Sequence, residues 1–186
     1  MAQETVTMTI TEALAELKTI KARIEKKTTS LMAYFVRDKG RIDPFADSDA
    51  GSTAQFWRRE TQAIEDLQDR IIDIRSAIQR ANQTTEAEIK GVVQTIADWL
   101  TWRREVLPVR KVFYETQLRA LNDVRRAEAQ NAVKKTSGPD VFVPEYVLAV
   151  DEQQLLKDAE FLTELAGALD GRLSLVNATT TITIPM

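Results

Sequence analysis

The chain has 186 residues and a formal net charge of −3 at pH 7, with 44% apolar and 28% charged residues. This composition is typical of one folded domain or one elongated repeat protein, and the weak net charge gives no reason to expect a nucleic-acid partner. There is no Cys and no His. Disulfides, thiolate metal sites and Cys nucleophiles are therefore excluded, and the commonest general base and transition-metal ligand are missing.

The sequence lacks the features of an enzyme, a membrane protein or a secreted protein. No apolar run approaches the roughly 18–20 residues of a membrane-spanning helix. Residues 1–5 lack the charged and apolar regions of a signal peptide. Because there is also no phosphate-binding Gly loop and no nucleophile motif, we expect no enzymatic activity and no cofactor. These observations predict a soluble protein, cytoplasmic as synthesised, for which a membrane partner is not expected.

The first half of the chain has the pattern of a long helical hairpin. Thr9 and Glu12 form a capping-box sequence that predicts the start of a helix, and we expect this helix to end near Arg37. A second helix is predicted over about 53–81. Two apolar seams of similar length predict an antiparallel, coiled-coil-like hairpin. The first helix has one heptad row of Ile10, Leu17, Ile24 and Leu31 and an adjoining row of Ala13, Ile20 and Tyr34, which Lys27 interrupts. The row of the second helix is Trp57, Ile64, Ile71 and Ile78.

The segment 41–53 between these helices contains several acidic residues near Gly51. Such a loop raises the question of a calcium site, but it lacks the closing Glu of an EF-hand. We therefore interpret it as a solvated hairpin turn, with no metal site.

The second half repeats this plan. Thr95 and Asp98 match Thr9 and Glu12, and a third helix follows, in which Pro108 is expected to introduce a kink. A loop around 137–139 and an extended stretch at 141–144 lead to a fourth helix that opens at Asp151. We expect its acidic residues to pair with a basic third helix. The apolar rows are Leu100, Leu107, Tyr114 and Leu121 in the third helix, and Leu155, Leu162, Leu169 and Val176 in the fourth.

Each hairpin ends in the sequence Asn-x-Thr-Thr. The residues concerned are Asn82, Thr84 and Thr85 in the first copy and Asn177, Thr179 and Thr180 in the second. Asn tolerates the left-handed conformation that ends a helix, and Thr favours the extended chain that follows. We interpret both Asn residues as helix ends and not as glycosylation sites. Together with the matching Thr-Ile starts, these endings indicate an internal duplication.

Short β-prone segments lie at both chain ends and between the hairpins, at 5–8, 88–93 and 181–184. They either meet as a small sheet where the hairpins join or pair with strands of another subunit. The predicted fold is mainly α, with two long antiparallel helical hairpins and these short β segments. Its parts are an N-terminal arm (1–8), a first hairpin (9–85), a connector (86–94), a second hairpin (95–180) and a C-terminal arm (181–186).

Partner contacts are predicted at the arms and at one tryptophan. Trp102 is flanked by Arg103 and Arg104, a combination typical of interfaces. The arms carry apolar residues in otherwise polar, β-prone chain ends. The candidate interface residues are Trp102, Val6, Met8, Ile182 and Ile184.

Several segments, taken in order, resemble the septicolysin-like family, small helical proteins of bacteria and phages. The C-terminal signature of that family is similar to residues 150–159, 169–173 and 177–180, and the segments 10–14, 70–82 and 95–107 fit the same pattern. The chain departs from the pattern at Ala178, where the family tends to have Trp, and in continuing through 181–186. The family name implies a pore-forming cytolysin, and the resemblance brings no catalytic residues.

These observations predict a non-enzymatic structural or assembly protein that forms homo-oligomers and binds other proteins of an assembly. A phage virion component, either a head-decoration or a tail-associated protein, is the setting that we expect. The alternatives are a septicolysin-like pore-forming cytolysin and a bacterial helical adaptor that binds partner proteins.

Overall fold

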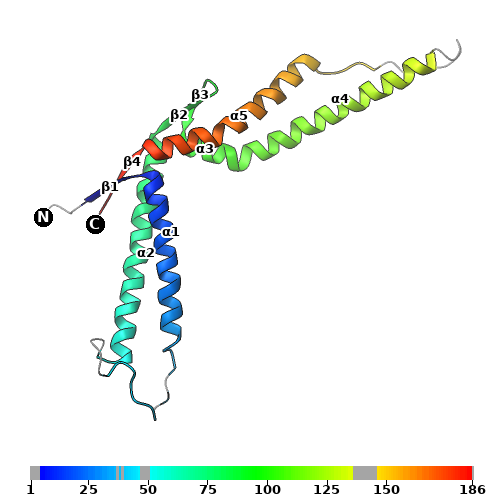
Figure 1. Ribbon diagram of the computed structural model, residues 1–186. Helices are drawn as coiled ribbons and strands as arrows, with labels where there is room; N and C mark the ends of the chain where they lie inside the picture. The colour runs from blue at the N-terminus through cyan, green and yellow to red at the C-terminus, as the bar shows by residue number, and fades with distance from the viewer. Residues whose placement is uncertain (1–4, 37, 39, 47–50, 136–145, 186) are drawn as a thin grey trace. The chain divides into compact units, whose positions relative to one another are not determined.

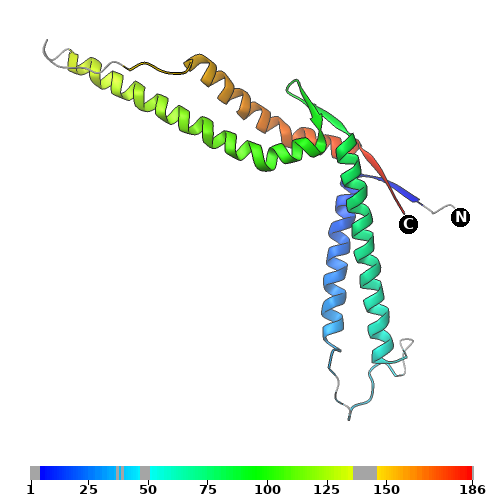
Figure 2. The same ribbon diagram turned by 180° about the vertical axis from the view of Figure 1, so that it is seen from behind.

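The computed structural model describes residues 5–36, 38, 40–46, 51–135 and 146–185. These residues form a mainly helical protein with short antiparallel strands, as Figures 1 and 2 show, and this confirms the predicted fold class. The chain divides into two compact units. Unit 1 comprises Met1–Thr85 and Ser174–Met186, and unit 2 comprises Glu86–Leu173. The C-terminal segment therefore belongs to the unit that contains the first hairpin.

Unit 1 is a helical hairpin with a two-stranded sheet at one end. Strand β1 (Thr5–Thr9) leads into α1 (Ile10–Met32), and α2 (Thr53–Thr84) returns beside α1 (Figure 1). Strand β4 (Thr181–Pro185) pairs antiparallel with β1, from Thr5 opposite Pro185 to Thr9 opposite Thr181. Of the two predicted alternatives for the arms, the structure contains the sheet within the chain.

The start of α1 is fixed by the predicted capping box. The Thr9 hydroxyl accepts a hydrogen bond from the Glu12 N–H at 3.2 Å, and the Glu12 carboxylate accepts one from the Thr9 N–H at 2.7 Å. The backbone bond from Thr9, with the bond from its hydroxyl, holds the pKa of Glu12 below its ordinary value. The end of α1 was predicted wrongly near Arg37, which lies outside the described residues. The helix stops at Met32 because Tyr34 and Phe35 leave it to pack on other aromatic rings.

The core of unit 1 lies where the sheet covers the hairpin. Strand β4 alternates exposed Thr with buried Ile, as a strand with one covered face must. Ile184 is fully buried and Ile182 is 5% exposed. The buried residues of this core are Ile10, Ala13, Leu17, Ile20, Ile74, Ala77, Ile78, Ile182 and Ile184, with Met8, Ile24, Leu67, Ile71 and Ala81 packed around them.

The end of β4 is also held by one cation of α2. Arg70 donates from Nε to Glu16 on α1 at 2.9 Å, and from its Nη1 to the carbonyl of Pro185. Because the side chains of this pair are only 21% and 30% exposed, the charges are partly desolvated and the bonds are stronger than those of a surface pair. Arg70 thus links α2, α1 and β4.

Unit 2 begins with a β-hairpin. Strands β2 (Glu86–Ile89) and β3 (Val92–Thr95) pair through a two-residue turn at Lys90 and Gly91, both of which have positive φ, as a type I′ turn requires. The chain then forms α3 (Ile96–Thr101), the π-helical turn η1 (Trp102–Val106), α4 (Leu107–Lys135) and α5 (Glu152–Thr179). The end of α5, from Ser174 to Thr179, belongs to unit 1. Trp99, 1% exposed, donates its Nε1–H to the carbonyl of Ala87 at 2.9 Å.

The irregularity predicted at Pro108 lies before that residue, as the π-helical turn η1. Proline has no N–H, and its ring clashes with the carbonyl four residues earlier, here that of Arg104. A wider turn relieves this clash, and the Leu107 N–H bonds to the carbonyl of Trp102, five residues back.

The pairing predicted between the third and fourth helices is partly present. Asp151 caps α5 by accepting from the N–H groups of Gln153 and Gln154, at 2.8 and 3.3 Å. Arg103 pairs with Asp170 at 3.0 Å, and Arg125 pairs with Glu152. These side chains are about half exposed, so they select the partner helix more than they stabilise it. The loop 137–139 and the stretch 141–144 lie outside the described residues.

The two helix ends with the repeated sequence differ from the prediction. Asn82 and Asn177 lie inside α2 and α5, so neither ends its helix in a left-handed conformation. The helices end two residues later, at Thr84 and Thr179. The hydroxyl of Thr84 bonds back to the carbonyls of Arg80 and Ala81, and the hydroxyl of Thr179 bonds to those of Leu175 and Val176. Each hydroxyl adds a second hydrogen bond to carbonyls of the last turn, where the Thr85 and Thr180 N–H groups already bond to the carbonyls of Ala81 and Val176.

The two halves of the sequence have the same order, strand, helical hairpin, strand, but the strands are exchanged. Each sheet combines the strand that enters one hairpin with the strand that leaves the other. The registers agree: Thr9 lies opposite Thr181, and Thr95, the equivalent of Thr9, lies opposite Glu86. The two sheets differ at one end: a turn at Lys90 and Gly91 joins β2 to β3, whereas no turn joins β1 to β4, whose paired residues there are Thr5 and Pro185. This agreement supports an internal duplication.

Replacing a core residue of β4 is expected to destabilise unit 1. Ile184→Ala leaves a cavity in a fully buried position, which costs roughly 2–5 kcal/mol, whereas Thr183→Ala on the exposed face stays within about 0.5 kcal/mol. Urea unfolding followed by circular dichroism measures both. Equal losses for the two variants would contradict the inward orientation of β4.

Removing the indole donor of Trp99 is expected to destabilise unit 2. Trp99→Phe keeps a ring but leaves the buried carbonyl of Ala87 without its partner, at a cost of about 1–3 kcal/mol. Trp102→Phe is the control, since this half-buried indole donates no hydrogen bond to any described residue. Thermal unfolding separates the two. A loss at Trp102 as large as that at Trp99 would argue against the hydrogen bond.

Candidate interaction site at the tip of the first hairpin

Exposed apolar side chains gather where α1 ends and α2 begins. Phe35 is 66% exposed, Val36 82% and Ile42 88%, and Met32 lies nearby at the end of α1 with its side chain also exposed. Contiguous exposed apolar surface on a folded protein marks an interaction site more often than single exposed residues do. We call the described residues among 33–36, 40–46 and 51–57 the hairpin tip.

Aromatic rings hold the tip together. Phe45 from the loop stacks on Phe56 of α2, with ring centroids 4.4 Å apart and planes 11° apart. Tyr34 meets both rings edge-on at 4.9 and 5.6 Å, and Phe35 lies 5.7 Å from Trp57. Such pairs add roughly 0.5–1.5 kcal/mol each beyond the area that they bury. The loop is therefore attached to the helices by packing.

A single carboxylate fixes the loop to the start of α2. Asp43 accepts from the Thr53 N–H at 3.1 and 3.2 Å, from the Thr53 hydroxyl at 2.7 Å and from the Phe45 N–H at 3.0 Å. Its position at the N-terminus of α2 also suits a negative charge. Ser52 caps the same helix through the Gln55 N–H.

Most described residues of the predicted solvated turn 41–53 are exposed, but Phe45 and Asp43 pack and bond against the helices. Among the described residues no group of three or more acidic side chains is arranged to hold a metal ion; Asp47 and Asp49 lie outside them. The sequence does indicate this packing, through a cluster of aromatic residues in and beside the loop that heptad spacing does not reveal. The aromatic residues Tyr34, Phe35, Phe45, Phe56 and Trp57 are all within a few positions of the loop.

The tip contains an apolar cleft of about 390 Å³. This volume is at the lower end of the roughly 300–1,000 Å³ typical of ligand clefts. It is lined by Tyr34, Phe35, Asp43, Ser52, Thr53, Ala54 and Trp57.

A second, basic cleft of about 310 Å³ is lined by Arg23, Lys26, Lys27, Ser30 and Glu60. Lys27, which interrupts the heptad row of α1, bonds to Glu60 of α2 at 2.7 Å. The polar residue in the seam is thus paired across the hairpin and forms part of the cleft wall.

The two clefts follow one another along one face of the hairpin. Residues 53, 57 and 60 of α2 are spaced by four and three positions, which places them on one face of that helix, and residues 23, 27 and 30 of α1 share this spacing. We call the two clefts together the hairpin groove. Its outer part is apolar and its inner part is basic.

The candidate interface residues from the sequence lie elsewhere. Ile182 and Ile184 are buried in the core of unit 1, and Met8 packs against that core, while Val6 is half-buried opposite Ile184. The arms are thus occupied by one another and by the hairpin. Of the two alternatives predicted for the arms, the pairing within the chain uses these residues, and it leaves the isoleucines of β4 buried.

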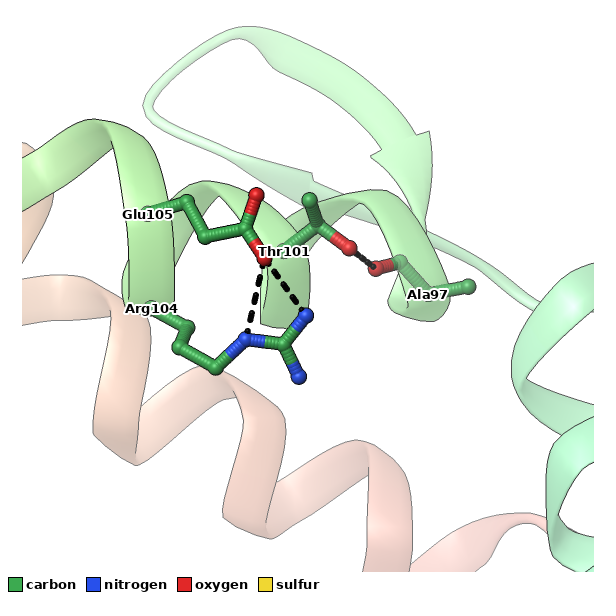
Figure 3. Close-up of polar contacts among 4 residues, drawn as sticks. All are labelled: Ala97, Thr101, Arg104 and Glu105. Carbon is green, nitrogen blue, oxygen red and sulfur yellow. Dashed lines mark hydrogen bonds and ion pairs between the residues drawn. The ribbon is translucent and has the colours of Figure 1, made fainter.

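Trp102 is half-buried, and its ring meets Trp99 edge-on at 5.8 Å. The polar groups of the surrounding turn satisfy one another (Figure 3): the Thr101 hydroxyl donates to the carbonyl of Ala97 at 3.0 Å, and Arg104 donates to Glu105 at 2.7 and 3.2 Å. Arg104 and Glu105 are largely exposed, so their pairing contributes little to stability.

None of the described helices has a segment long and apolar enough to cross a membrane. No protein-family model matches the chain. No curated protein matches it either.

A crystal structure of a functionally unknown conserved protein from Corynebacterium diphtheriae is similar to this chain. The TM-score is 0.53 at 21% sequence identity, over 95% of this chain and 99% of the other. At this identity the similarity shows a shared fold over nearly the full length of both chains.

Removing the carboxylate of Asp43 is expected to loosen the tip. Asp43→Ala leaves the N–H groups of Thr53 and Phe45 without their acceptor, at a local cost of about 1–3 kcal/mol. Hydrogen exchange measures this as faster exchange of both amides. Asp38→Ala, which removes an exposed acceptor of the Gly40 N–H, is the control. Unchanged exchange at Thr53 in the Asp43 variant would disprove the attachment.

Proposed function

We propose that the protein is a non-enzymatic assembly protein that docks other protein chains through the tip of its first hairpin. The observation that carries the proposal is the exposure of Phe35, Val36 and Ile42 around an apolar cleft. Large apolar and aromatic side chains that remain exposed in the folded chain are the type of surface that protein interfaces bury.

The tip is suited to binding because its described residues already contact one another and α2 within the chain. The rings of Tyr34, Phe45 and Phe56 contact one another, and Asp43 ties the loop to α2. A surface that is fixed before a partner arrives loses less conformational entropy on binding. Trp57 and Tyr34 also belong to the residue types that most often dominate binding energy.

The setting of this assembly is part of the proposal. We propose a phage virion component, with a bacterial adaptor as the cellular alternative, and genes for head or tail proteins beside the coding gene would support the former. The pore-forming alternative follows from the family resemblance alone, and release of dye from liposomes would support it.

Site-specific photocrosslinking tests the docking role. A photoreactive phenylalanine analogue in place of Phe35 is expected to yield discrete crosslinked protein adducts in cells that produce the protein, because this ring lies at the proposed contact. The same analogue in place of Gln68, an exposed position of α2 away from the tip, is the matched control and is expected to yield none. Adducts are measured by gel shift and identified by mass spectrometry.

The absence of adducts at position 35, or the same adducts at positions 35 and 68, would reject the proposal. Adducts that contain a second copy of the chain and adducts that contain another protein both support it, since the proposal requires only that protein chains dock at the tip.

A further inference from the structure

The hairpin groove has two parts of different chemistry in a fixed order. Tyr34, Phe35 and Trp57 make the outer part apolar, and Arg23, Lys26 and Lys27 make the inner part basic. Thr53 in the apolar part and Glu60 in the basic part are seven positions apart in α2, which corresponds to about 10 Å along the helix. An occupant that satisfies both parts needs large apolar side chains followed, about 10 Å further on, by carboxylates.

The basic part of the groove contains cations that are exposed to solvent. Arg23 and Lys26 are exposed and form no ion pair with any described residue, whereas Lys27 is already paired with Glu60. Arg58 and Arg59 at the start of α2 are exposed as well. Glu25 is the exposed carboxylate in this stretch of α1, so cations predominate. The inner part of the groove therefore favours an acidic occupant.

Unit 2 carries a segment with the complementary order. Residues 146–150 belong to no helix or strand, and their side chains are exposed, with Val147 at 90%. Asp151 follows at once and opens α5, whose further exposed carboxylates include Glu160 and Glu164. The apolar residues of the segment are Tyr146, Val147, Leu148 and Val150.

The spacing of this segment matches the groove. Leu148 precedes Asp151 by three residues, which is about 10 Å in extended chain. With Leu148 or Val147 in the apolar cleft, Asp151 reaches the region of Lys26 and Arg23. The caps that Asp151 provides to α5 use one of its oxygens and leave its negative charge in place.

From this match we infer that the hairpin groove binds residues 146–151 of a second copy of the chain. The inference rests on the proposed function and names the partner of the same site. The groove lies in unit 1 and the segment lies in unit 2, so the contact is heterologous. Each copy of the chain has one groove and one segment. Such a contact builds rings or filaments.

Two surface variants test this contact without affecting either core. Phe35→Ser removes an exposed ring from the groove, and Val147→Ser removes an exposed apolar side chain from the segment. Sedimentation velocity is expected to show concentration-dependent oligomers for the full natural chain and association weakened by about tenfold or more for each variant alone. An equimolar mixture of the two variants is expected to form dimers, because one intact groove meets one intact segment.

Charge provides the second arm of the experiment. Lys26→Glu is expected to weaken self-association about threefold to tenfold, and added salt to weaken that of the natural chain. Arg75→Glu, at an exposed position of α2 outside the groove, is the matched control and is expected to leave association unchanged.

Three results would overturn the inference: a natural chain that stays monomeric throughout the micromolar range, a mixture of variants no more associated than its components, or equal effects of Lys26→Glu and Arg75→Glu. A monomeric chain that still gives adducts with other proteins at position 35 would reject the inference and leave the proposed function standing. A monomeric chain that gives no adducts at position 35 would reject both the inference and the proposed function.

Discussion

The structure of unit 1 depends on the pairing of β4 with β1. Two antiparallel helices alone leave much of their apolar seam exposed to water, and the buried residues here gather where the sheet covers α1 and α2. Ile182 and Ile184 supply the missing wall of that core, and Arg70 holds the end of the strand. Further from the sheet Ile24 and Leu67 are only partly buried, and Leu31 near the end of α1 is buried again.

The strand that completes unit 1 comes from the other half of the chain, and the same is true of unit 2. Each hairpin therefore needs a strand from the other half of the sequence to complete its sheet, although the two halves have equivalent elements and equivalent registers. This exchange of strands makes the two halves interdependent. It also explains why the chain ends carry buried isoleucines, a feature that sequence reasoning had assigned to contacts with other subunits.

The far end of the first hairpin is held together by different interactions from those at its strand end. It lies beyond the reach of the sheet, and rings and one carboxylate replace the missing core there: Phe45 on Phe56, Tyr34 against both, and Asp43 on Thr53. This packing attaches Phe45 and Asp43 to the helices and leaves Phe35, Val36 and Ile42 exposed. An exposed apolar tip costs solubility unless something covers it, which is the physical basis of the docking role proposed for it.

The sequence alone determined the features that depend on neighbours three or four residues away. The capping box of Thr9 and Glu12, the heptad rows and the cap at Asp151 are local, and they were predicted because helix geometry brings such residues together whatever the rest of the chain does. Tertiary structure decided which strands pair, that Ile184 is buried, that the turn before Pro108 is π-helical, and that Phe45 reaches Phe56 to form the tip. These contacts join residues distant in sequence or compete with a local preference, and periodicity carries no information about either.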